Sequence, residues 1–73
     1  MDAMENVKKS LYEGYKWLYE EAVANVKKCL NLAKERREWG KMGWAAGWID
    51  AANVHYVLAK GYKRSMEFYR KYQ

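Results

Sequence analysis

Residues 39–43 decide the fold of this chain, and they read Trp39-Gly40-Lys41-Met42-Gly43. The chain has no proline, and on both sides of this segment apolar residues recur at steps of three and four, the period of an α-helix. Gly40 can adopt the left-handed backbone conformation that ends a helix, and Arg36 and Arg37 lie in the turn before it, where cations are favoured. The pattern predicts two helices joined by a turn at about residues 39–43, in a single helical domain over residues 1–73.

The first helix is expected over residues 2 to about 38. Its apolar and small residues follow the helical period at Met4, Val7, Leu11, Tyr15, Leu18, Ala22, Val26, Cys29 and Ala33. A neighbouring stripe contains Tyr12, Tyr19, Val23, Val26 and Leu30, and charged residues fill the rest of the surface. This distribution is typical of an amphipathic helix with one wide apolar face.

The second helix is expected over residues 44 to about 71. No Ser, Thr, Asp or Asn stands before it as a cap, so its start is placed only within residues 42–44. It carries two apolar stripes, which lie about 100° apart around the axis. The first comprises Ala45, Trp48, Ala52, His55, Ala59, Tyr62, Met66 and Tyr69. The second, which we call the outer seam, comprises Trp44, Gly47, Ala51, Val54, Leu58, Gly61, Ser65, Phe68 and Tyr72.

Folding the chain back at the turn makes an antiparallel hairpin in which the numbers of facing residues sum to about 81. Ala52 then lies near Cys29 and Ala59 near Ala22, so small residues oppose each other and the helices can approach closely. One helix cannot cover both stripes of the second. The expected fold is therefore an all-α two-helix hairpin that dimerises into a four-helix bundle. The expected partner interface comprises Trp44, Gly47, Ala51, Val54, Leu58, Phe68 and Tyr72.

The size of the chain independently favours a second chain as partner. Seventy-three residues lie near the lower limit for one self-sufficient hydrophobic core. Cys29 is the single cysteine, so no intrachain disulfide can form, which fits a reducing cytoplasm. With a single histidine as well, the chain cannot build a four-ligand zinc site alone. Self-association, or binding to a target protein, is the reinforcement that remains.

The residues with chemical potential do not form a catalytic pattern. His55 is expected in the core beside Asn25, as a polar layer that defines the register. The competing interpretation is a haem or metal ligand whose second histidine comes from a symmetry-related chain. Asp50 and Asn53 fall on the exposed side of their helix, and Cys29 falls among small residues of the core. We expect no enzymatic activity, no cofactor and no metal.

The net charge of +5 and the pI near 9.4 raise nucleic acid as a partner. Basic residues crowd the turn, and the expected nucleic-acid contacts there are Lys34, Arg36, Arg37 and Lys41. The helix dipole explains much of the same distribution, because it favours cations late in a helix. Nucleic-acid binding is accordingly the alternative function.

Residues 42–59 are the one candidate for a membrane span, because this stretch holds a single formal charge. Asp50 lies near the middle of this stretch, and a central carboxylate costs about 2.5–3.5 kcal/mol on insertion. Insertion into a membrane is therefore not expected, and a small membrane-associated protein is the least favoured interpretation.

Abundant aromatic residues support the leading interpretation. Four Trp, seven Tyr and one Phe are more large rings than one hairpin can bury, and Trp, Tyr, Met and Arg are enriched in protein interfaces. We expect a non-enzymatic protein-binding module, a homodimeric helical regulator or phage-type inhibitor that blocks a target protein. The sequence does not identify that target.

Overall fold

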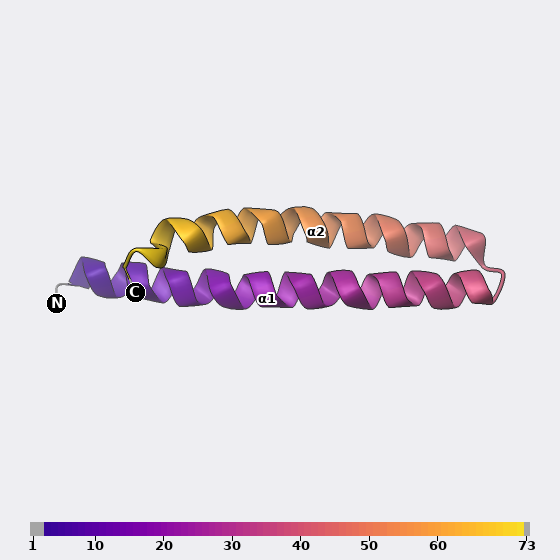
Figure 1. The fold of residues 1–73 in the computed structure, drawn as a ribbon, viewed down its shortest axis with the longest axis horizontal. Helices are drawn as coiled ribbons and strands as arrows, with labels where there is room; N and C mark the ends of the chain where they lie inside the picture. Colours follow the sequence, from indigo (N-terminus) through magenta and orange to yellow (C-terminus); the bar gives the residue numbers. More distant parts are fainter. Residues whose placement is uncertain (1–2, 73) are drawn as a thin grey trace.

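The computed structural model describes residues 3–72 and consists of two helices, α1 (Ala3–Glu38) and α2 (Met42–Arg70). The helices run antiparallel, with the turn at one end and, at the other, which we call the open end, the start of α1 and the end of α2 (Figure 1). No strand occurs in the described residues, and the expected all-α helical hairpin is confirmed. The Cα positions extend over 58 × 13 × 13 Å. The first helix was expected to start at residue 2, which lies outside the described residues.

The turn closes α1 through its glycine. Gly40 has φ 75°, and its amide donates to the Arg37 carbonyl at 3.0 Å, while the Lys41 amide donates to the Arg36 carbonyl at 2.8 Å. These two bonds form a Schellman motif, which satisfies carbonyls at the end of a helix. Because the motif ends at Lys41, α2 can begin at Met42, at the early end of the expected range.

The start of α2 has no side-chain cap. Lys41 occupies the N-cap position, and its carbonyl accepts the first helical hydrogen bond, from the Ala45 amide at 2.9 Å. The lysine side chain donates only, so it cannot satisfy the free amides of the first turn. The first turn of α2 therefore lacks a stabilisation that most helices have.

Small side chains form the contact between the helices. The buried apolar residues are Ala22, Cys29 and Ala33 of α1 and Ala45, Ala52 and Ala59 of α2. No large side chain is fully buried among the described residues. Alanines let two helices approach closely, but each of them removes little apolar area from water.

Aromatic contacts at the open end agree with the expected register. The Tyr15 ring lies between Tyr62 and Tyr69, with ring centroids 6.5 and 6.0 Å away. Lys8 Nζ lies 3.2 Å from the Tyr72 hydroxyl, beyond this cluster. The hairpin thus has small residues along its middle and large rings toward the open end.

Candidate functional site

The outer seam lies on one flank of the contact between the helices. Trp44, Ala51 and Leu58 each precede a buried alanine of α2 by one residue, and one residue step turns the helix by about 100°. The large members are strongly exposed: Trp44 by 64%, Val54 by 59%, Leu58 by 43% and Phe68 by 60%. The hairpin therefore leaves uncovered the stripe that the sequence predicts as a partner interface.

Two glycines of the outer seam have no explanation within the hairpin. A Cβ atom added at Gly47 or at Gly61 would meet nothing within 4 Å. Glycine inside a helix costs about 1 kcal/mol relative to alanine, so each position lowers helix stability without relieving a contact in this chain. Close approach of another helix would explain both.

Large and small residues alternate along the outer seam. Val54 and Leu58 form its middle, where they line a shallow hollow of about 350 Å³ with Asn53 and Val57. Before and after this middle come pairs of small residues, Gly47 with Ala51 and Gly61 with Ser65. Large side chains of a facing helix can fit at the small positions of this pattern, as in coiled-coil packing.

Tyr72, at the end of the outer seam, is engaged within the chain. It is half-buried, and its hydroxyl accepts a hydrogen bond from Lys8 Nζ at 3.2 Å. That hydrogen bond, with smaller contributions from the charges of Lys71 and Lys8, lowers the pKa of Tyr72 below its ordinary value. Tyr72 therefore ties the end of α2 to α1, and the uncovered part of the seam ends before it.

A groove lies on the opposite flank of the contact. Lys60 follows the buried Ala59 by one residue, whereas Leu58 precedes it, so these two side chains leave α2 on opposite sides. The groove encloses about 480 Å³. Its lining comprises Tyr19, Val23, Val26 and Lys27 of α1 and Tyr56, Ala59, Lys60, Lys63, Arg64 and Glu67 of α2.

The rim of the groove is cationic and the floor is apolar. Lys27, Lys60, Lys63 and Arg64 supply four positive charges, against one negative charge from Glu67. None of these five side chains forms an ion pair with another residue of 3–72. The Lys60 ammonium lies 5.4 Å from the centre of the Tyr56 ring. We call this surface the basic groove.

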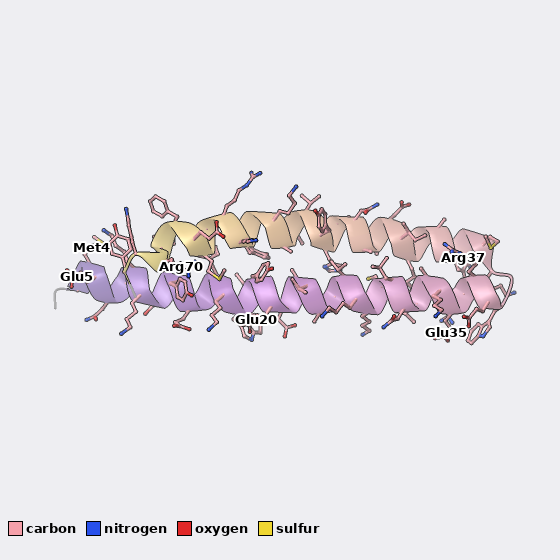
Figure 2. The ribbon with its side chains drawn as sticks, viewed as in Figure 1. Met4, Glu5, Glu20, Glu35, Arg37 and Arg70 are labelled. Atoms are coloured by element: carbon pink, nitrogen blue, oxygen red, sulfur yellow. The ribbon has the colours of Figure 1, made fainter. Side chains whose placement is uncertain are left out.

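Of the four predicted nucleic-acid contacts at the turn, three are exposed and one packs against the protein. Lys34, Arg37 and Lys41 are exposed, and Figure 2 shows Arg37 at the turn end of the hairpin. Arg36 instead packs against the protein: its side chain is only 20% exposed and pairs with Glu35 at 3.2 Å.

Two tryptophan rings lie near the Arg36 guanidinium. Its central carbon lies 4.6 Å from the Trp39 ring centre and 5.8 Å from that of Trp44. Its Nε atom is buried and has no hydrogen-bond partner among the described residues. Arg36 therefore contributes more to packing at the turn than to an accessible cationic surface.

The remaining candidate residues do not assemble into a reactive site. Asn25 and His55 are both half-buried, but within the described part of the chain no hydrogen bond joins them. Asp50 and Asn53 are exposed, and Cys29 is a buried free thiol. No group of three or more metal-ligating side chains occurs within residues 3–72.

The basic groove was not predicted from the sequence, which pointed only to the basic residues at the turn. One signal was available: Lys60, Lys63, Arg64 and Glu67 repeat at steps of three and four, so they share one side of a helix. Lys27 joins them only because α1 packs beside α2.

Comparisons of this chain with protein-family models, curated proteins and solved structures return no match. Neither helix, over the described residues, combines the length and the apolar character that crossing a bilayer requires. The function is therefore inferred from the two surfaces alone.

Proposed function

We propose that this chain is a non-enzymatic protein-binding module that forms a homodimer through the outer seam and blocks a target protein, as phage-type inhibitors do. One observation carries the proposal: the buried contact consists of alanines and one cysteine, while the large apolar side chains of the seam stay exposed. Pairing two outer seams would convert two hairpins into a four-helix bundle.

The exposed area supports a second chain. The hairpin exposes 5555 Å². A compact monomer of this mass exposes only about 4,700 Å². The excess of about 800 Å² equals what one partner buries in a standard protein interface.

The chemistry of the outer seam supports a copy of the same chain as the partner. Its nine residues include no Asp, Glu, Lys, Arg or His, so two seams can face each other without pairing like charges. Its alternation of large and small pairs lets the large side chains of one copy fit the small positions of another.

The setting of the free thiol supports a reducing compartment. Cys29 is buried and unpaired, and a single cysteine gives no intrachain disulfide to protect. We place the protein in the cytoplasm for this reason.

Two matched leucine variants test the homodimer. Leu58 in the outer seam and Leu30 on α1 are exposed to similar degrees, 43% and 48%. Leu58→Asp removes about 1 kcal/mol of apolar burial per chain and adds a buried carboxylate on each side of the interface. We expect this variant to sediment as a monomer at concentrations where the parent chain and Leu30→Asp sediment as dimers. A monomeric parent chain would refute the homodimer.

Nucleic-acid binding at the turn is the second candidate, supported by the exposed Lys34, Arg37 and Lys41. It ranks lower because the Arg36 side chain is only 20% exposed and lies near two tryptophan rings. Binding to RNA or DNA that weakens steeply between low and physiological salt, and that Arg37→Glu abolishes, would raise it to first place.

A further inference from the structure

We propose that the basic groove binds an acidic amphipathic helix of the target protein. The inference rests on the proposed function, since it names the class of partner, but it uses the flank opposite to the dimer seam. Its observations are the apolar floor, the unpaired cations of the rim and the dimensions of the groove.

The dimensions fit a short helix. The lining spans residues 19–27 of α1 and 56–67 of α2. At a rise of 1.5 Å per residue these stretches are about 12 and 16 Å long, which is two to three helical turns. A helix that lies in the groove, along the junction of α1 and α2, can place one row of apolar side chains against the floor formed by Val23, Val26 and Ala59. The floor is wide enough for such a row because Ala59 carries only a methyl group.

The charges of the rim select an acidic helix. Lys60, Lys63 and Arg64 follow one side of α2, and Lys27 faces them from α1. Carboxylates that flank the apolar row of a bound helix would therefore meet cations on both sides. Glu67, at the end of the α2 side, favours a basic residue at one end of the bound helix and so gives it a preferred direction.

Two other occupants fit less well. A second copy of this chain would bring a net charge of +5 toward four unpaired cations, and nucleic acid would bring phosphates toward Glu67. The floor is also mainly aliphatic between its two tyrosines, whereas single-stranded nucleic acid requires aromatic faces on which bases stack. Acidic side chains beside an apolar row satisfy both the rim and the floor.

A synthetic peptide provides the test with the full-length chain. The probe is a fluorescent amphipathic helix of about three turns with leucines along one side, glutamates beside them and both termini blocked. The matched probe carries lysine at every glutamate position. We expect the glutamate peptide to bind at low salt and more weakly at physiological salt, and the lysine peptide not to bind.

Paired charge reversals locate the binding. Lys60→Glu with Lys63→Glu should lower the affinity for the glutamate peptide by about tenfold or more. Lys28→Glu with Lys34→Glu changes the net charge by the same amount at exposed positions outside the groove, and should change the affinity less than about threefold. Amide chemical shifts of Val23 and Val26 should move on binding, because both residues lie in the floor.

Four results would overturn the proposal. They are equal binding of both peptides, equal effects of the two pairs of charge reversals, no binding of the glutamate peptide, and tighter binding of a single-stranded RNA to the groove. Sedimentation of the same samples separates the two proposals. A dimer that binds no glutamate peptide refutes only the groove, and a monomer that binds it refutes only the homodimer.

Discussion

Replacing the two glycines of the outer seam by alanine distinguishes an isolated hairpin from a dimer, because the change in stability has opposite signs in the two cases. Gly47 and Gly61 lie inside α2, and a Cβ atom at either position meets open space in the single chain. If the chain acts alone, the double variant gains helix stability. If a second helix packs on the seam, the same methyl groups occupy space that the partner needs.

The magnitude follows from these surroundings. Inside a helix, alanine is more favourable than glycine by about 1 kcal/mol of helix-forming free energy. The two replacements together should therefore raise the unfolding free energy of an isolated hairpin by about 2 kcal/mol. In a two-fold dimer the variant adds four methyl groups to one interface, and overpacking typically costs about 1–3 kcal/mol per site. We therefore expect Gly47→Ala with Gly61→Ala to raise the dimer dissociation constant by at least about tenfold.

Urea unfolding at two protein concentrations measures both quantities. The parent chain should unfold at higher urea when it is more concentrated, because association stabilises the folded state. The double variant should lose this dependence and sediment as a monomer. Gly14→Ala is the control, since Gly14 is also open in the single chain and belongs to neither apolar stripe of α1. It should add about 1 kcal/mol and leave the dimer intact.

The proposed close approach of a second helix is refuted if the two replacements simply add their gains in helix stability. If the double variant gains about 2 kcal/mol at both concentrations and its oligomeric state is that of the parent chain, no helix approaches the outer seam at Gly47 or Gly61. The glycines would then need another explanation.

Three further predictions concern the hairpin itself. Ala52→Leu should lower the unfolding free energy by about 1–3 kcal/mol, because a larger side chain does not fit at this buried position between the helices. Ala46→Leu, on the exposed side of α2, should change the unfolding free energy by less than about 0.5 kcal/mol. Equal effects of the two variants in urea unfolding would contradict the alanine contact. Lys8→Met should return the pKa of Tyr72 toward its ordinary value of 10.0, which tyrosinate absorbance can follow with Tyr72→Phe as the reference. Because the pKa of Tyr72 is lowered in the folded chain, the Lys8–Tyr72 pair stabilises the fold fully above pH 10.0, and this stabilisation is lost as the pH falls through the lowered pKa. A Tyr72 titration that Lys8→Met leaves unchanged would exclude the hydrogen bond as the cause of the lowered pKa. Arg36→Ala should lower the unfolding free energy by about 1 kcal/mol through loss of contact with two tryptophan rings, and an unchanged thermal midpoint would show that this packing contributes nothing.

The expected polar layer illustrates a limit of pattern-based prediction. Helical spacing brings Asn25 and His55 to the same level of the hairpin, and both are half-buried there. Spacing does not determine rotamers, and no hydrogen bond joins the two side chains within the described residues. The identity of a facing pair can be predicted from sequence, whereas its hydrogen bond depends on the distance between the helices.

The sequence alone predicts the two helices, the turn between them and the sides on which the helices meet. Each depends on local rules: the helical period of apolar residues, the positive φ that Gly40 adopts, and the small residues Cys29 and Ala52 that fit a close contact. The exposed outer seam followed from the same period, because one helix can cover only one of two stripes that lie 100° apart.

Only the tertiary structure shows the basic groove, the contacts of Arg36 with two tryptophan rings and the Lys8–Tyr72 hydrogen bond. The groove and the Lys8–Tyr72 hydrogen bond need side chains from both helices within a few ångströms of one another, and the contacts of Arg36 need side chains from both sides of the turn. The register brings Lys8 and Tyr72 to the same level of the hairpin, but it does not determine the side-chain rotamers that form their hydrogen bond. The uncovered outer seam is thus a property of the α2 sequence pattern, whereas the cation-rimmed groove exists only because α1 and α2 lie side by side.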